Sequence, residues 1–273
     1  MNEIGVIAEL HKEDNCFLPV AEMGLPVCQL VNWDETLWTD TMAEKVTSDA
    51  RKAGVRICAL WAGVPGPRVW NFREGPTTLG LVPPQFRAMR VASLKKAAQF
   101  AHQIGVSAII THVGFIPENM ADPQFSATVD AVREVAVTCR SLGIEFWFET
   151  GQETPITLLR AIDSVGTDNL GINLDPANLI LYGKGNPIDA LDVFGSYVRN
   201  IHAKDGFYPT DPFELGREVK VGEGKVRYPE FVRRLKEIGF SGEFIIEREI
   251  SGPQQKEDIR ETVDYLKRLL EEK

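Results

Sequence analysis

The sequence contains few cysteines and no apolar run that approaches the length of a membrane span. Its four cysteines lie far apart and form no CxxC pair; they are Cys16, Cys28, Cys58 and Cys139. This spacing argues against a disulfide framework and a structural zinc site, and it predicts free, mostly buried thiols in a reducing compartment. Because a bilayer span needs about 20 consecutive apolar residues, no membrane partner is expected. The protein is predicted to be cytoplasmic.

Basic residues are also fewer than acidic residues. The chain has 30 Lys and Arg residues against 39 Asp and Glu residues, which gives a net charge of −9. Such a charge repels polyanions, so nucleic acid is not an expected partner. The N-terminus carries no basic segment ahead of an apolar one, so no signal peptide is expected.

The distribution of apolar residues predicts strands and helices that alternate along the chain. With 273 residues, of which 44% are hydrophobic, the chain can form one large α/β core. Segments of helical spacing separate short apolar runs, and a glycine follows several of the helices, as in Ala53-Gly54-Val55. Eight of the apolar runs predict buried strands; they cover residues 4–10, 27–31, 55–60, 108–113, 144–149, 170–175, 198–203 and 243–247.

Eight strands that alternate with helices predict a single (β/α)8 TIM barrel, with residues 1–273 as one domain. The alternative is an open doubly wound sheet, which should carry a glycine-rich phosphate loop after its first strand. Residues 11–16 contain no glycine, so the barrel is favoured. Two loops are longer than a barrel needs, at residues 61–84 and 204–227. The first is rich in Pro, Gly and aromatic residues, and we expect it to contribute to specificity.

Four ionisable residues lie at the ends of four neighbouring predicted strands, where TIM-barrel enzymes keep their active sites. They are Glu149, Asp175, His202 and Glu247. A charged group at the end of an apolar strand is costly unless it is paired or bound to a metal, and clustered carboxylates repel one another without a cation. A salt-bridged strand end explains any one of them, but the four together predict one divalent metal ion. Three carboxylates and one imidazole favour Mn²⁺, with Mg²⁺, Co²⁺ or Zn²⁺ as alternatives.

The order of several motifs resembles the xylose isomerase-like TIM-barrel superfamily, which comprises sugar phosphate isomerases and epimerases and the AP endonuclease family 2 relatives of endonuclease IV. The motifs are Glu149, Asp175-Pro-Ala-Asn178, Ile201-His202-Ala-Lys204-Asp205, Gly222-Glu223-Gly224 and Ile246-Glu247. The resemblance extends over essentially the whole chain. It implies that Glu149, Asp175, His202 and Glu247 are the metal ligands, and that Glu149 and Glu247 are also the catalytic acid and base.

The activity implied by this resemblance is that of a sugar isomerase or epimerase. The metal would chelate a carbonyl and a neighbouring hydroxyl, acidify the C–H between them and stabilise the resulting enediolate. One glutamate would remove the proton and the other would return it. Asn178 stands where several members have a histidine, and Tyr208 where certain ketose epimerases have an arginine. These departures and the long aromatic loop favour a keto-glycoside or keto-inositol over a free ketohexose.

Five further residues are predicted to contact this carbohydrate. His112 ends the fourth strand and would orient a hydroxyl or act as a further base. Lys204 would contact sugar oxygens, although a surface ion pair explains it equally well. Glu153 would bind a hydroxyl or support the ligands, Trp70 would contribute to an apolar platform, and Asn178 follows the strand-six aspartate.

Other activities are compatible with the same residues. A lyase or dehydratase acting on a keto-inositol or 3-keto-glycoside would share the proton abstraction. An endonuclease IV-like nuclease needs a cluster rich in histidine, whereas this chain has four histidines and a negative charge that opposes phosphate binding. A catalytically inactive carbohydrate-binding barrel is a further alternative. Whether the protein forms a homodimer or homotetramer is left open.

Overall fold

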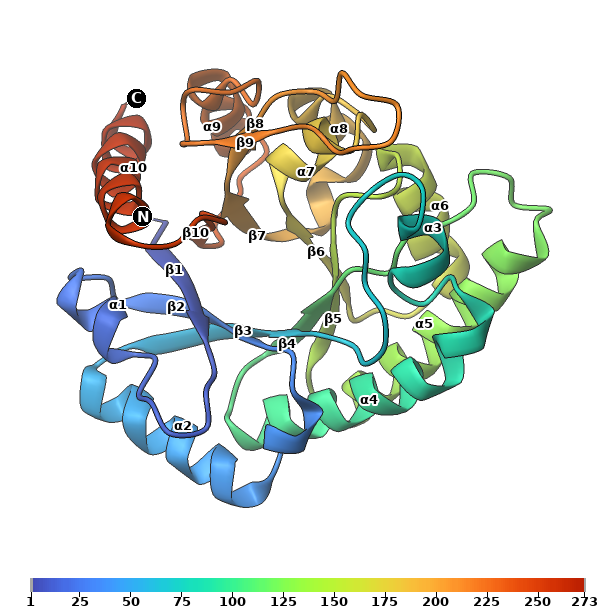
Figure 1. Cartoon of the computed structure of the whole chain (residues 1–273), viewed down its shortest axis with the longest axis horizontal. Helices are drawn as coiled ribbons and strands as arrows, with labels where there is room; N and C mark the ends of the chain where they lie inside the picture. The colour runs from blue at the N-terminus through green and yellow to red at the C-terminus, as the bar shows by residue number, and fades with distance from the viewer. Residues whose placement is uncertain (1, 273) are drawn as a thin grey trace.

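A closed barrel of eight parallel strands, surrounded by helices, forms the centre of the molecule (Figure 1). The computed structural model describes residues 2–272. Each barrel strand pairs with the preceding barrel strand in the chain, and the first strand closes the barrel against the last. The predicted (β/α)8 barrel is therefore confirmed. Its strands are β1 (Ile4–Glu9), β2 (Val27–Asn32), β3 (Arg56–Ala62), β4 (Ala108–Thr111), β5 (Glu145–Glu149), β6 (Leu170–Leu174), β7 (Val198–Ala203) and β10 (Phe244–Ile246).

Proline and glycine mark the ends of many of the surrounding helices. Six of the helices begin with a proline residue, whose fixed φ suits the first helical turn and whose missing N–H costs nothing there. Gly54, predicted as a helix end, adopts φ +68° after its helix. The helices are α1 (Leu18–Glu22), α2 (Asp40–Ala53), α3 (Gly75–Thr78), α4 (Pro84–Gln103), α5 (Pro123–Ser141), α6 (Pro155–Val165), α7 (Pro176–Leu181), α8 (Pro187–Phe194), α9 (Tyr228–Glu237) and α10 (Pro253–Glu271), with 3-10 turns η1 (Glu35–Leu37) and η2 (Gly195–Tyr197).

Side chains on the strands alternate between the helix layer and the barrel interior. On β5, Phe146 and Phe148 belong to the large core shared with the helices, whereas Trp147 belongs to a smaller apolar cluster of strand residues. Because strand side chains alternate with a period of two, Glu149 shares the interior face with Trp147. On β7, His202 likewise alternates with neighbours that pack against the helices. Apolar side chains thus fill the barrel toward the amino-terminal ends of the strands, and polar groups lie at the carboxyl end.

The two long loops contain structure that the sequence did not predict. The loop after β3 carries α3, and the loop after β7 carries the two-stranded antiparallel sheet of β8 (Asp205–Gly206) and β9 (Glu218–Val219). Strand β3 runs two residues beyond its predicted end, so Trp61 lies on the strand and not in the loop.

Two expectations about composition can be compared with the structure. The four cysteines are free, and three of them are buried, as predicted. Among the helices of residues 2–272, none is both long enough and apolar enough to cross a membrane.

Candidate metal centre

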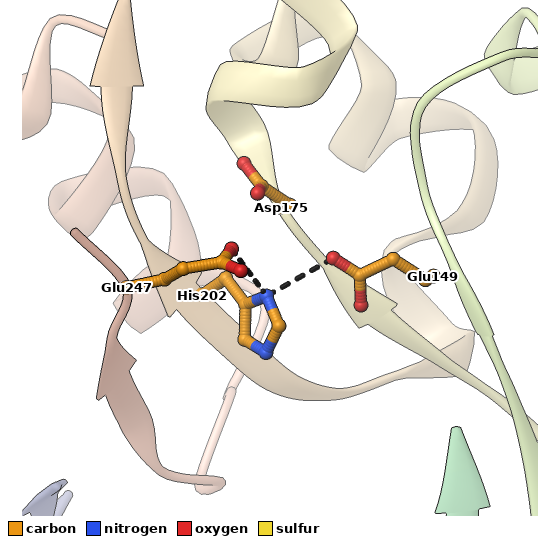
Figure 2. A group of neighbouring side chains, drawn as sticks. All are labelled: Glu149, Asp175, His202 and Glu247. Atoms are coloured by element: carbon orange, nitrogen blue, oxygen red, sulfur yellow. Dashed lines mark ion pairs between the residues drawn. The ribbon is translucent and has the colours of Figure 1, made fainter. Parts of the chain in front are cut away.

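The four predicted ligands converge at the carboxyl end of the barrel (Figure 2). Glu149 is the last residue of β5 and His202 lies near the end of β7, while Asp175 and Glu247 directly follow β6 and β10. Each residue offers one possible ligand atom, and these four atoms lie within 4.8 Å of one another. Side chains from four strands, separated by as many as 98 sequence positions (247 − 149), therefore form one cluster.

The imidazole of His202 lies at the centre of the cluster. Its Nδ1 is 3.0 Å from Glu149 Oε1 and 3.1 Å from Glu247 Oε2, the two contacts drawn in Figure 2. Its Nε2 lies 2.7 Å from Gln29 Oε1. Because an amide oxygen only accepts hydrogen bonds, Nε2 must donate, which leaves Nδ1 directed at the carboxylates.

Three buried amide side chains, of Gln29, Asn173 and Asn200, form hydrogen bonds next to the predicted ligands. Asn173 Nδ2 donates to Glu149 Oε2, and Asn173 Oδ1 accepts from Gln29 Nε2 at 3.3 Å and from Asn200 Nδ2 at 2.6 Å. The chain of bonds therefore fixes Glu149 and, through Gln29, the ring of His202. Partners of this kind orient metal ligands in proteins. Sequence reasoning did not select these three amides, although their alternation with apolar residues places them on the interior face.

Mutual charge effects shift the pKa values within the cluster. Burial acts to lower the pKa of His202, but the charges of Glu149 and Glu247 outweigh it and raise that pKa well above its usual range. For Asp175, burial itself raises the pKa well above its usual range, although the charge of Lys204 opposes this shift. Burial opposes ionisation of Glu247, but Lys204 and His202 overcome it and lower its pKa. Protons held by His202 and Asp175 thus offset part of the negative charge of the cluster.

The chemistry and spacing of the cluster fit a divalent cation. The second carboxylate oxygen of Asp175, Oδ2, is buried and has no hydrogen-bond partner among the described residues. Ligand atoms on opposite sides of an ion with bonds of about 2.1 Å lie about 4.2 Å apart, which is close to the observed spread of 4.8 Å. Carboxylate oxygens and one imidazole are ligands for a hard or borderline metal. The cluster can therefore hold one metal ion after small side-chain movements.

Lys204 is buried beside the cluster, with 3% of its side chain exposed. Its Nζ lies 2.9 Å from Glu249 Oε1, 3.4 Å from Glu247 Oε2 and 3.7 Å from Asp175 Oδ2. Its backbone N–H donates to the hydroxyl of Tyr228 at 3.0 Å. The alternative interpretation of Lys204 as part of a surface ion pair is therefore wrong.

The neighbouring Asp205 anchors the loop that follows β7. Its carboxylate accepts hydrogen bonds from the backbone amides of Gly222 and Gly224, both at 3.0 Å, and of Val226 at 3.1 Å. A Cβ atom on Gly224 would lie 2.1 Å from Asp205 Oδ1, which explains the glycine there. The carboxylate of Asp205 therefore accepts the amide hydrogen bonds that the Gly222–Gly224 turn offers.

A cavity of about 390 Å³ opens onto the cluster. Glu149 and Glu247 line it, and so do four of the five predicted substrate-binding residues; these are Trp70, His112, Asn178 and Lys204. Asn178 donates its Nδ2 to Thr150 O at 3.2 Å. Burial lowers the pKa of His112, and its Nδ1 has no partner among the described residues. The ring of Trp70 lies 5.2 Å from that of His112.

The fifth of these residues, Glu153, does not line the cavity, and its predicted contact with the substrate stays a prediction. Only 3% of Glu153 is exposed, and burial raises the pKa of its carboxyl to about 8. In the unfolded chain the pKa is about 4.5. Between these values the folded state retains a proton that the unfolded state releases, so stability must fall as the pH rises through this range.

Replacing Glu153 with glutamine should remove this dependence. The free energy of unfolding of Glu153→Gln minus that of the wild type should increase by roughly 1 kcal/mol for each pH unit between about pH 5 and 8. Urea unfolding at several pH values measures the difference. The exposed Glu44 on α2 provides the control, since Glu44→Gln should follow the wild type. Parallel curves for Glu153→Gln and the wild type would show that Glu153 is ionised in the folded state.

The fold and the cluster together define a (β/α)8 barrel with buried Glu, Asp and His side chains at its carboxyl end that could hold a metal ion. Residues 17–269 match the family model of the xylose isomerase-like TIM barrel. The chain belongs to this family, which confirms the resemblance found in its motifs.

Solved structures agree with this assignment. A xylose isomerase domain protein from Planctomyces limnophilus is 34% identical, with a TM-score of 0.92, over 98% of this chain and 96% of that one. A xylose isomerase-like barrel from Mycobacterium smegmatis, in complex with magnesium, is 17% identical, with a TM-score of 0.73 and coverage of 99% and 97%. The 3-keto-D-glucoside 4-epimerase of E. coli is 14% identical, with a TM-score of 0.72 and coverage of 98% and 100%. The last two similarities show the fold alone.

Proposed function

We propose that this protein is a divalent-metal-dependent isomerase or epimerase, which moves a proton next to the carbonyl of a keto-sugar or keto-glycoside. One observation carries the proposal. Of the four ligand residues, Glu149 and Glu247 line the cavity, whereas Asp175 and His202 do not. Two of the carboxylates are therefore available to a substrate, and the other two residues remain free to hold the ion.

The residues of the cluster would divide the work between binding the metal and moving the proton. When bound by Glu149, Asp175, His202 and Glu247, the cation would withdraw electron density from the carbonyl and stabilise the enediolate. Mn²⁺ is favoured, with Mg²⁺, Co²⁺ or Zn²⁺ as alternatives. Glu149 ends β5 and Glu247 directly follows β10; one of them would remove the proton and the other would return it on the opposite face.

The neighbouring polar residues would bind and orient the sugar. Lys204 Nζ is held by Glu249 and Glu247 and would donate to a substrate oxygen. His112 is neutral, because burial lowers its pKa, and its free Nδ1 would bond a hydroxyl. Asn178 would contact the same substrate from the start of α7.

Aromatic side chains on one side of the cavity favour a bulky substrate. The rings of Trp33 and Trp61 are 4.7 Å apart, and Trp70 packs edge-on against Trp33 at 6.5 Å. All three line the cavity and would provide an apolar surface for a sugar face. This wall, and the fold shared with a 3-keto-D-glucoside 4-epimerase, support a keto-glycoside or keto-inositol as the substrate. Residues 1–273 would act as one catalytic domain.

Solvent isotope exchange tests the proposed reaction. The metal-loaded protein is incubated in D₂O with a set of keto-sugars, keto-inositols and 3-keto-glycosides, and the products are followed by NMR. We expect deuterium at the carbon next to the carbonyl of an intact, isomerised product. Loss of water or of the aglycone would instead identify a lyase. Absence of exchange from every substrate, with metal bound, would contradict both reactions and leave a binding protein.

A further inference from the structure

Arg90 on α4 is a fully buried cation that stacks over the Phe86 ring of its own helix, and its hydrogen-bond partners among the described residues are all backbone carbonyls. Its Nε donates to Pro65 O at 3.0 Å, its Nη1 to Gly80 O at 2.7 Å and its Nη2 to Pro67 O at 2.8 Å. No exposed surface remains on the residue, and burial lowers the pKa of its guanidinium to about 10. A cation without a carboxylate partner is costly to bury. The positions of the three carbonyls that accept its hydrogen bonds therefore indicate which segments Arg90 holds together.

These carbonyls belong to both limbs of the loop that carries Trp70. The loop leaves β3, passes through Trp70 and α3, and returns to α4 (Figure 1). Pro65 and Pro67 lie on the outgoing limb, and Gly80 lies on the returning limb. One guanidinium therefore holds the two limbs together at the base of the loop.

The returning limb is also fixed against the segment that follows His112. Gly80 adopts φ +67°, and a Cβ atom on it would lie only 2.0 Å from Val113 O. The next residue, Leu81, donates its N–H to the same Val113 O at 2.7 Å. The base of the loop is therefore fixed in position relative to the segment after β4, where His112 lines the cavity.

The tip of the loop is held together by its own hydrogen bonds. Asn71 Oδ1 accepts from the amides of Arg73 at 3.0 Å and Glu74 at 2.8 Å, and Val69 N donates to Thr78 Oγ1 at 3.1 Å. Outside the loop, Phe72 N donates to Phe213 O at 2.9 Å. The hydrogen bonds within the tip fix its shape, so its position depends on its base and on its contacts with Phe213.

We infer that Arg90 is a positioning residue, which sets Trp70 in the cavity wall by joining the two limbs of its loop. Trp70 is 39% exposed and is not buried deeply enough to hold the loop by its own packing. Arg90 lies behind the wall and would act on substrate affinity rather than on proton transfer. Its effect on affinity rests on the proposed function, but its effect on the loop does not.

Hydrogen exchange measured by mass spectrometry tests the effect on the loop without any substrate. In Arg90→Met, amides of residues 63–80 should exchange roughly tenfold faster, because three buried carbonyls lose their donor. Arg90→Lys should loosen the same segment, since one ammonium cannot replace the planar fork of a guanidinium. This second variant keeps the charge and serves if Arg90→Met does not fold. Unchanged exchange in this segment, or equally faster exchange throughout the barrel, would overturn the inference.

Arg87 provides a matched control on the same helix. It donates to Leu81 O at 2.7 Å and to Val82 O, at the end of the returning limb, and does not bond the outgoing limb. Arg87→Met should therefore leave exchange of residues 63–80 unchanged. If it loosens this segment as much as Arg90→Met does, joining the two limbs is not the function of Arg90.

Kinetics separate positioning from a general structural role. With a substrate that the wild type converts, Arg90→Lys should raise KM roughly tenfold and change kcat by less than about twofold. Trp70→Ala should raise KM similarly, and the double variant should be no worse than either single one, because both act on one contact. Additive effects, or a lower kcat at unchanged KM, would contradict the inference. If no keto-sugar is converted, the proposed function fails while the exchange measurement still decides the role of Arg90.

Discussion

Replacing Asp175 with asparagine should abolish metal binding and lower turnover by roughly a thousandfold or more. Asp175 Oδ1 accepts the Asn178 amide at 2.9 Å and so begins α7. Asparagine is an equally good residue at such a position, so the helix should persist. The substitution replaces a carboxylate oxygen, Oδ2, that is buried and has no hydrogen-bond partner among the described residues. Elemental analysis should find about one metal ion per wild-type chain and none in the variant.

Asp122 offers a control of the same chemistry. It begins α5 by accepting the Gln124 amide at 2.8 Å, so Asp122→Asn exchanges aspartate for asparagine at a second helix start. This variant should keep its metal. Full metal content in Asp175→Asn would assign the ion to other residues, and a wild-type protein that binds no divalent metal at neutral pH would rule out the proposed mechanism.

Replacing either proposed base should stop epimerisation, but the variant should still exchange the proton of one of the two epimers with solvent. Glu247→Gln and Glu149→Gln keep the size of each side chain but remove its basicity, so net conversion should fall by roughly 10²–10⁴ in each. If each glutamate serves one face of the reacting carbon, each variant should still exchange the proton of one epimer in D₂O. NMR of the two epimers, incubated separately with each variant, measures this selectivity.

Glu145 lies at the opposite end of β5, where its carboxylate accepts from Trp147 Nε1 at 2.6 Å. Glu145→Gln therefore controls for a change of charge on the same strand and should retain activity. Exchange of both epimers by both single variants would show that Glu149 and Glu247 are not the two bases. Loss of the metal from either variant would show that binding and proton transfer cannot be separated at that residue.

Much of the barrel and the cluster could be predicted from local patterns. Short apolar runs identified all eight barrel strands, because a strand buried on both faces needs apolar side chains throughout. Charged residues at the ends of such runs identified Glu149, Asp175, His202 and Glu247, which the fold brings together. The same reasoning erred at Trp61, since an apolar strand that continues into an aromatic loop has no sequence signal at its end.

Other features depend on contacts between distant segments. The burial of Lys204 follows from its packing among Asp175, Glu247 and Glu249, which no local pattern reveals. The cavity excludes Glu153, although that residue lies only four positions after Glu149. Arg90 has the sequence surroundings of an ordinary helical arginine, and its role depends on carbonyls of a loop up to 25 positions away.

The sequence by itself determined the eight barrel strands and the four ionisable residues at their carboxyl ends, because apolar runs and the polar residues that end them are local patterns of a few residues. Only the tertiary structure decided which side chains share a layer. Gln29 reaches His202 across 173 positions, since closure of the barrel brings the interior faces of β2 and β7 to the same height. The orientation of the imidazole therefore depends on the register of the closed barrel.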